Sequence, residues 1–149
     1  MESIVCFKSK FGWINAKESN GCILSVAFGK IKQKKPSKIL IALKNNICRY
    51  FLGEEIIKEF PLIVIGTPLQ KKIWNELLKI PYAKTNTYGK IAQKLKTSPR
   101  YVGNVCGQNN HLLLIPCHRV VRSDGSLGGF SGLGGMKLKS KLIKIEFNA

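Results

Sequence analysis

The apolar positions of the first 66 residues fall into short runs separated by turn residues, which is typical of antiparallel strands. Three runs are rich in β-branched and aromatic residues, at 3–8, 12–17 and 22–28. Asn20 and Gly21, between the second and third runs, are a strong hairpin signal because both residues tolerate the positive φ of a tight turn. We therefore predict an antiparallel three-stranded meander.

One helix is expected to follow this sheet. From residue 37 to about residue 52 the apolar positions recur every three or four residues: Leu40, Leu43, Ile47 and Phe51. This spacing predicts a helix with one buried face. Gly53 can end it, because glycine readily adopts the left-handed conformation found after many helices. Residues 60–65 are interpreted as a further strand or an extended linker, and the whole region as a scaffold.

At Thr67 the pattern becomes helical. Thr67 can cap a helix, Pro68 fits its first turn, and Gln70 can complete a capping box. Four apolar residues then line one face: Leu69, Ile73, Leu77 and Ile80. We place a domain boundary here, which gives an N-terminal α/β scaffold domain at 1–66 and a C-terminal domain at 67–149.

Two short helices joined by a tight turn are expected within the C-terminal domain. The first covers 88–96, and the second begins at Pro99 with Ser98 as its N-cap. With the surrounding lysines they form a candidate helix-turn-helix for DNA, although such helix pairs also occur as plain packing units. Arg100 lies near the start of the second helix, where exposed amides attract phosphate.

The chain is strongly basic, and the excess is concentrated in its C-terminal part. Its 149 residues contain 25 lysines and arginines against 8 acids, a formal net charge of +17. Residues 1–66 carry a net charge of +6 and residues 67–149 a net charge of +11. Such a charge favours a polyanionic partner, with nucleic acid as the first expectation. A lysine-rich solvated surface, as in some thermophile proteins, is the alternative.

Cysteine usage and the lack of long apolar runs narrow the class of protein. Five cysteines without regular spacing do not indicate a secreted disulfide framework. Cys6, Cys22 and Cys48 lack a CxxC pairing and lie far from both histidines, so no metal site is expected, while a disulfide among the three stays open. No leader-like start and no apolar run near the ~20 residues of a membrane span is seen. We expect a soluble, cytoplasmic protein without membrane contact.

The hexapeptide at 115–120 (IPCHRV) is the strongest chemical signal. An apolar run at 112–115 leads into Pro116, which cannot donate to a sheet ladder, so the chain leaves regular structure just before Cys117. A thiolate is the best side-chain nucleophile near neutral pH when its pKa is lowered. A buried structural cysteine is the alternative interpretation.

A last helix, expected from about residue 136, adds an acid. Its apolar face consists of Leu138, Leu142 and Ile145. Glu146 lies at the edge of that face, and an acid turned toward a core needs a partner, whereas a solvent-exposed Glu146 is the alternative. With His118 it would form a Cys-His-Glu relay. Because neighbours in extended backbone point to opposite sides, we expect a bridging water between Cys117 and His118.

These motifs resemble those of the O6-alkylguanine-DNA alkyltransferases. The hexapeptide is similar to that family's active-site motif, and Asn109 stands eight residues before the cysteine, as the family's asparagine does. Four further segments resemble its helix-turn-helix (87–92 and 97–103), its base-covering loop (128–131) and its final helix (141–146). The resemblance covers about residues 67–147. It implies an α/β (α+β) fold, in which a ribonuclease H-like three-stranded antiparallel sheet with a helix precedes a mostly helical, winged-helix-like domain.

The resemblance also implies roles for individual residues. Cys117 is similar to the alkyl acceptor, with His118 and Glu146 as its water-bridged relay. Asn109 resembles the residue that steadies the active-site turn. Tyr88 resembles the phenol that meets guanine N3, helps to neutralise the departing base and crowds the phosphate so that the nucleotide rotates out. The implied DNA contacts are Tyr88, Arg100, Ser98, Tyr101, Lys90 and Arg119, with Arg100 filling the vacated space. The implied base pocket consists of Val120, Phe130, Ser131, Cys106 and Leu127.

The implied function is DNA repair by direct reversal. The alkyl group of O6-alkylguanine in duplex DNA, and less well that of O4-alkylthymine, would pass to Cys117 once per molecule, after the base is flipped through the minor groove. No cofactor or metal is expected, and the protein would act as a monomer near the nucleoid, with cooperation on DNA left open. The alternatives are a non-catalytic lesion-binding protein, a cysteine hydrolase and a plain helix-turn-helix regulator. Phe130 stands where a tyrosine is often found, so one hydroxyl contact is lost while the apolar wall remains. The stretch 132–135 is about two residues longer than in some relatives, which leaves the pocket size open.

Overall fold

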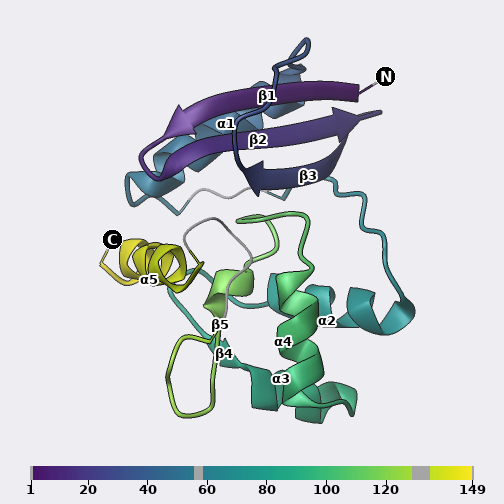
Figure 1. The fold of residues 1–149 in the computed structure, drawn as a ribbon, viewed down its shortest axis with the longest axis vertical. Helices are drawn as coiled ribbons and strands as arrows, with labels where there is room; N and C mark the ends of the chain where they lie inside the picture. The colour runs from purple at the N-terminus through teal and green to yellow at the C-terminus, as the bar shows by residue number, and fades with distance from the viewer. Residues whose placement is uncertain (1, 56–58, 129–134, 149) are drawn as a thin grey trace. The chain divides into compact units, whose positions relative to one another are not determined.

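The computed structural model describes residues 2–55, 59–128 and 135–148, and it divides into two compact units (Figure 1). The first unit comprises the chain up to Val64 together with Asn110–Leu114. The second comprises Ile65–Asn109 and Ile115–Asn148. The division into domains 1–66 and 67–149 remains a prediction, to which the structure adds that Asn110–Leu114 groups with the first unit. The expected mixed α/β fold with a three-stranded antiparallel sheet is confirmed.

The sheet of the first unit is the predicted meander. Its strands pair antiparallel in the order β1 (Glu2–Ser9), β2 (Gly12–Ser19) and β3 (Cys22–Phe28). Asn20 and Gly21 have φ angles of 52° and 81°. Positive φ at both positions matches the right-handed twist of paired strands, so the Asn-Gly pair sets this hairpin. One register shift interrupts the pairing of β2 with β3 at Lys17/Glu18.

Helix α1 (Lys38–Phe51) covers one face of this sheet (Figure 1). The Ser37 hydroxyl caps it by accepting a hydrogen bond from the Leu40 amide. Its buried face contains Leu40, Leu43, Ile47, Tyr50 and Phe51. Burying one such aliphatic side chain contributes roughly 1.5–3 kcal/mol, which is far more than helix propensity supplies. The helix ends before Gly53, whose φ is 96°, as predicted.

Two segments add single bridges to β3. Leu62 bridges Ile23, and His111 bridges Val26, both in parallel orientation. Residues 60–65 therefore contain no regular strand and correspond to the extended linker. The buried His111 ring lies with its Nε2 atom 3.0 Å from the Ile23 carbonyl oxygen. Burial lowers the pKa of His111, so the neutral ring donates this hydrogen bond.

The second unit begins with helix α2 (Pro68–Leu78), whose predicted capping box is present. The Thr67 hydroxyl accepts from the Gln70 amide, and the Gln70 side chain accepts from the Thr67 amide. On the buried face of α2, the indole N–H of Trp74 donates to the Val105 carbonyl at 3.1 Å. This bond ties α2 to helix α4 (Pro99–Gly107).

The predicted helix-turn-helix consists of α3 (Tyr88–Leu95) and α4, which pack against each other. Lys96 ends α3 with a left-handed φ of 58°. Ser98 then caps α4 by accepting a hydrogen bond from the Tyr101 amide at 3.1 Å. The local capping signals of the sequence thus account for both helix boundaries.

A short parallel pair joins this motif to the cysteine segment. Strand β4 (Asn86–Thr87) pairs with β5 (Val120–Val121). Strand β4 leads directly into α3, and β5 follows the 3-10 turn η1 (Cys117–Arg119). The pairing therefore brings the first residue of α3, Tyr88, close to the cysteine turn. Helix α5 (Gly135–Phe147) packs against that turn.

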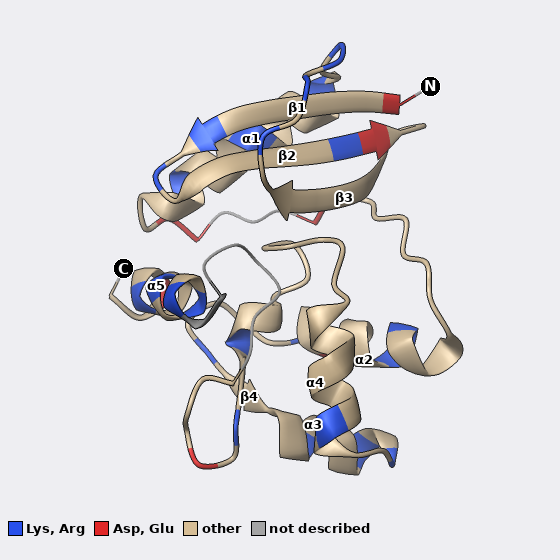
Figure 2. Cartoon of the chain, viewed as in Figure 1, with Lys and Arg blue, Asp and Glu red and all other residues tan. Residues whose placement is uncertain are grey.

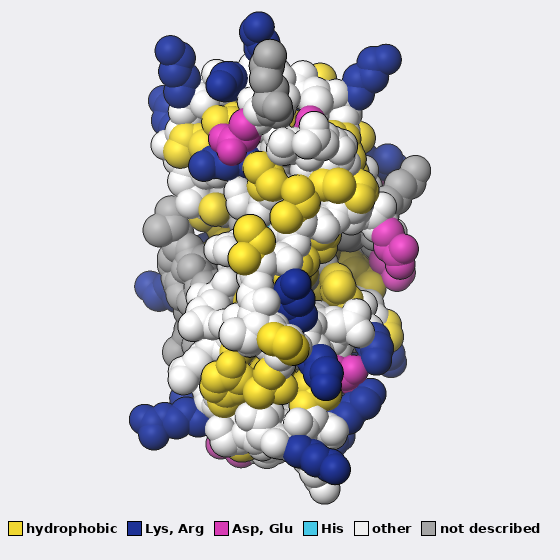
Figure 3. Space-filling view, turned by 90° about the vertical axis from the view of Figure 1, so that its right-hand side faces the viewer, with side chains coloured by type: hydrophobic (Ala, Val, Ile, Leu, Met, Phe, Trp, Pro, Cys, Tyr) yellow, Lys and Arg dark blue, Asp and Glu magenta, His cyan; other side chains and the backbone are white. Residues whose placement is uncertain are grey.

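Basic side chains occur on most elements of both units, whereas acidic ones are few (Figure 2). The face drawn in Figure 3 likewise shows many more lysine and arginine side chains than acidic ones. Among the described residues, no helix combines the length and the apolar character that crossing a membrane requires.

Candidate active site

Cys117 opens the turn η1 and is 2% exposed. Two hydrogen bonds shape this turn, from the Cys117 amide to the Ile115 carbonyl at 2.8 Å and from the Arg119 amide to the Pro116 carbonyl at 3.0 Å. The buried Asn109 side chain donates to the same Ile115 carbonyl at 2.8 Å. Asn109 thus bonds to the backbone two residues before the thiol, and its role in the active-site turn stays a prediction.

His118 and Glu146 meet in the interior of the second unit. The His118 Nε2 atom lies 2.6 Å from Glu146 Oε2, and both side chains are almost fully buried. Burial is the largest influence on His118 and lowers its pKa, although the bond to Glu146 acts in the opposite direction. We therefore describe His118 as a neutral ring whose Nε2–H donates to the carboxylate.

Glu146 is also the partner of Arg119. The Arg119 Nε and Nη2 atoms donate to its two oxygens at 2.9 and 3.2 Å, and the Ala83 amide donates to Oε1 at 3.0 Å. The Arg119 Nη1 atom donates to the Ile80 carbonyl at 2.8 Å. The expectation that Arg119 contacts DNA is therefore corrected, because its guanidinium is buried and bonded within the protein.

Tyr88 has a partner that the sequence did not indicate. The ammonium of Lys139, on α5, donates to the Tyr88 hydroxyl at 3.1 Å and to the Leu127 carbonyl. Lys139 is 0% exposed, so burial lowers its pKa to about 8, while the charge of Cys117 acts in the opposite direction. Burial raises the pKa of Tyr88. The phenol therefore stays protonated and can serve as a proton donor.

The sequence contained one signal for Lys139. Residues 139, 142 and 146 follow the spacing of one helix face, and all three are buried. Ile145, which was expected on the apolar face, is only half-buried. The buried face of α5 thus keeps Leu138 and Leu142 and also includes Lys139 and Glu146.

Of the remaining implied pocket residues, Cys106 interacts electrostatically with Cys117. Cys106, on α4, is buried, and its pKa is raised to about 12 by burial and then by the charge of Cys117. Val120 is buried and Leu127 is half-buried. Phe130 and Ser131 lie outside the described residues.

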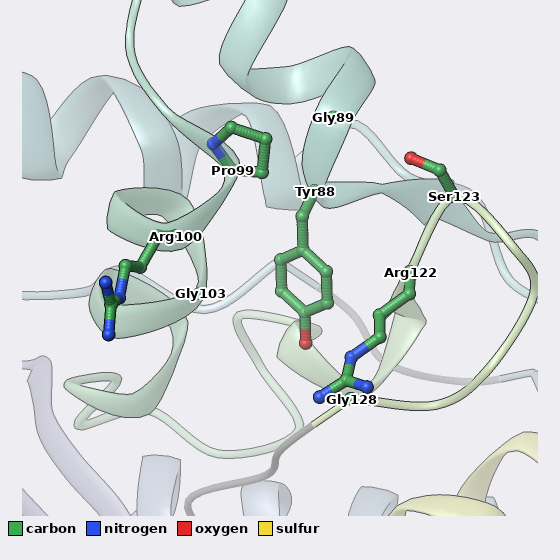
Figure 4. A pocket seen from close by; sticks show the side chains of 8 residues that line it. All are labelled: Tyr88, Gly89, Pro99, Arg100, Gly103, Arg122, Ser123 and Gly128. Atoms are coloured by element: carbon green, nitrogen blue, oxygen red, sulfur yellow. The ribbon is translucent and has the colours of Figure 1, made fainter.

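A pocket of about 320 Å³ opens beside Tyr88 (Figure 4). It is lined by Tyr88, Gly89, Pro99, Arg100, Gly103, Arg122, Ser123 and Gly128. A Cβ atom on Gly128, whose φ is +71°, would lie 2.9 Å from Tyr88 Cε2, so only glycine lets the chain pass this close to the ring.

Apart from the buried Tyr88, the expected DNA contacts on the helix pair are accessible. Lys90, Ser98 and Arg100 are exposed and Tyr101 is half-buried. The part of the chain that the structure describes contains no cluster of three or more His, Cys, Asp or Glu side chains suited to a metal ion.

Comparison with known proteins places this arrangement in context. Residues 68–148 match the family model of the 6-O-methylguanine DNA methyltransferase DNA-binding domain. The methylated-DNA–protein-cysteine methyltransferase of Saccharolobus islandicus is 34% identical over 142 residues, which cover 94% of this chain and 92% of that protein. The protein of the same name from Candida albicans is 46% identical over 84 residues, which cover 56% of this chain and 47%, or about half, of that protein. The crystal structure of Mycobacterium tuberculosis OGT in complex with DNA matches with a TM-score of 0.85 and 27% identity, covering 97% of this chain and 92% of that chain.

Proposed function

The chain belongs to the 6-O-methylguanine DNA methyltransferase family, and we propose that it repairs duplex DNA by transferring the alkyl group of O6-alkylguanine irreversibly to Cys117. One observation carries the choice of acceptor. Cys117 lies in a turn held by Asn109, directly before a histidine that is bonded to the buried Glu146. O4-alkylthymine is proposed as a poorer substrate.

In the proposed reaction, the Cys117 sulfur bonds to the alkyl carbon while the bond from that carbon to guanine O6 breaks, and the electron pair stays on the base. The thiol proton passes through water to His118, which Glu146 orients. Tyr88 gives a proton to guanine N3. The nearby Lys139 ammonium stabilises the phenolate that remains, and the proton on His118 returns to Tyr88 through solvent.

The product is a thioether, which has no good leaving group. No second thiol is proposed to release the alkyl group, so each molecule would act once. The reaction needs no external oxidant, reductant or cofactor, because the thiol supplies the electron pair and the protein supplies the protons. Cys117 is then a reagent that is consumed.

The DNA side of the proposal rests on the helix pair. Extruding a base costs a few kcal/mol in lost stacking and pairing. Arg100, exposed at the start of α4, would fill the vacated space as α4 enters the minor groove, and Tyr88 would crowd the phosphate. Phosphate neutralisation by exposed lysines of the helix pair, such as Lys90, would supply affinity. We propose that the protein acts as a monomer on chromosomal DNA, in the cytoplasm of the cell.

The alternative functions have less support. A lesion-binding protein without chemistry would not need a cysteine in this turn. A cysteine hydrolase would need a histidine that reaches the thiol directly, and His111 is bonded to the Ile23 carbonyl in the first unit instead. A plain helix-turn-helix regulator would not need a buried histidine-carboxylate pair beside a thiol.

The test is to mix the protein with a duplex that carries O6-methylguanine and to map the protein by mass spectrometry. We expect one methyl group per molecule, on the peptide that contains Cys117, and stoichiometric repair. Cys117→Ser should abolish transfer, whereas Cys48→Ser, on α1, should leave it unchanged. Methyl transfer to another cysteine, or many turnovers per molecule, would contradict the proposal.

A further inference from the structure

The mouth of the pocket contains a second arginine, to which the proposed reaction gives no task. Arg122 follows β5 and lines the same pocket as Tyr88 and Arg100. Figure 4 shows the two arginines on opposite sides of the tyrosine ring, with both guanidinium groups toward the hydroxyl end of the ring. The Arg122 side chain is exposed, so packing alone does not explain its place.

Arg122 forms no ion pair with any acidic side chain in the described part of the chain. The nearest acid in sequence is Asp124, whose Oδ1 atom accepts from the Ser126 amide at 2.9 Å and the Ser126 hydroxyl at 2.7 Å. These bonds lower the pKa of Asp124, and the charge of Arg122 adds to the effect without forming an ion pair. The guanidinium therefore has its bidentate donor set available for an anion that arrives with the substrate.

The backbone holds Arg122 at this mouth. Its amide donates to the Ser126 carbonyl at 2.8 Å, and its carbonyl accepts from the Gly125 amide at 2.9 Å. The adjoining Ser123 packs so closely on α3 that a Cβ atom on Gly89 would lie 2.9 Å from the Ser123 Oγ atom. A closed turn anchored to α3 thus presents the arginine in a defined position.

The charge of Arg122 reaches the phenol. Burial raises the pKa of Tyr88, and Arg122 acts in the opposite direction. A base that enters beside Tyr88 stays joined to its sugar and phosphodiester, whose negative charge must stay in contact with solvent or meet a counter-charge. The mouth is where Arg122 lies.

We propose that the Arg122 guanidinium binds a backbone phosphate of the flipped nucleotide, on the side of Tyr88 opposite Arg100. The inference rests on the proposed function, because that function brings a flipped nucleotide to this pocket. Under this inference the two arginines of the pocket have different roles. Arg100 occupies the space that the base leaves, and Arg122 holds the extruded nucleotide so that it does not return to the duplex.

The test measures binding separately from transfer. Full-length protein carrying Cys117→Ser is titrated against a labelled duplex with one O6-methylguanine, from about 50 to about 200 mM salt. Arg122→Ala should weaken binding about tenfold and should reduce the steepness of log K against log salt by about 0.9, the value for one phosphate contact. Lys144→Ala, on the exposed side of α5, removes the same charge away from the pocket and should change neither quantity.

Two further measurements make the test more specific. Arg122→Lys should keep the salt slope but recover only part of the affinity, because an ammonium lacks the planar fork. With Cys117 intact, Arg122→Ala should lose much less of its reaction with free O6-benzylguanine than of its reaction with the duplex, since a free base carries no phosphate.

Equal binding by Arg122→Ala and Lys144→Ala would overturn the inference, and so would an equal loss of reaction with the free base. Failure of the wild-type protein to alkylate Cys117 would refute the proposed function instead. The binding titration does not depend on transfer, so the two failures are distinguishable.

Discussion

The carboxylate of Glu146 is buried in the second unit, so its charge must be compensated by partners within the protein. It accepts hydrogen bonds from His118, from two nitrogens of Arg119 and from the Ala83 amide. In Glu146→Ala the Arg119 guanidinium would stay buried without its counter-charge. Removing one partner of such a pair costs about 3–5 kcal/mol, which is a large share of the roughly 5–15 kcal/mol that stabilises a typical domain.

Urea denaturation measures this loss as a change in the free energy of unfolding. The melting temperature should fall with it, by roughly 2–4 °C per kcal/mol for a chain of this size. The matched control is the double variant Arg119→Met with Glu146→Leu, which removes both charges and keeps similar volume. It should recover most of the stability, because replacing a buried pair by apolar residues is often close to neutral. A loss below about 1 kcal/mol in the single variant, or a double variant less stable than the single one, would refute this reasoning.

Two other substitutions test the site, and a third tests the buried histidine of the first unit. Lys139→Met should raise the free energy of unfolding, because no ammonium is then buried, and should slow transfer. In single-turnover kinetics the wild-type rate should decline as pH rises through about 8, where Lys139 loses its proton. The Lys139→Met variant should not show this decline. Gly128→Ala should slow transfer and destabilise the fold, since its Cβ atom would lie 2.9 Å from the Tyr88 ring, whereas Gly107→Ala, with nothing within 4 Å, should do neither. Because the pKa of His111 is lowered in the folded state, the unfolded chain takes up the proton first, so stability should fall as pH drops below about 6.5. In His111→Gln the loss of unfolding free energy between pH 7 and pH 5, measured by urea titration, should be smaller than in the wild type. An equal loss in both proteins would show that the His111 ring is not the group responsible.

Local chemistry made much of the fold predictable from the sequence. The Asn-Gly pair sets a hairpin because of its own φ preferences, and the Thr67 and Ser98 caps act within three residues of themselves. The apolar spacing of α1 likewise depends only on residues within that helix. These signals do not need a partner from elsewhere in the chain.

The residues that the sequence analysis assigned wrongly or missed have partners far away in the sequence. The guanidinium of Arg119 was assigned to DNA on the family resemblance alone, and its partner Glu146 is 27 residues away. Lys139 was not considered because a lysine in a helix normally faces solvent. Its place became clear only when the fold brought the Tyr88 hydroxyl and the Leu127 carbonyl to the same point.

Helix α5 therefore supplies a partner to each of the two proton-transfer groups in the proposed reaction. On α5, Lys139 bonds to Tyr88 and Glu146 bonds to His118. The two residues are seven positions apart, which places them on one face about 10 Å apart along the axis. A single residue inserted between them would rotate one partner by about 100° relative to the other. Such an insertion should abolish transfer even where α5 still folds, whereas an alanine inserted after Phe147, beyond both residues, should be tolerated. Circular dichroism and single-turnover transfer would separate the two outcomes, and an active insertion variant would show that α5 does not set this geometry.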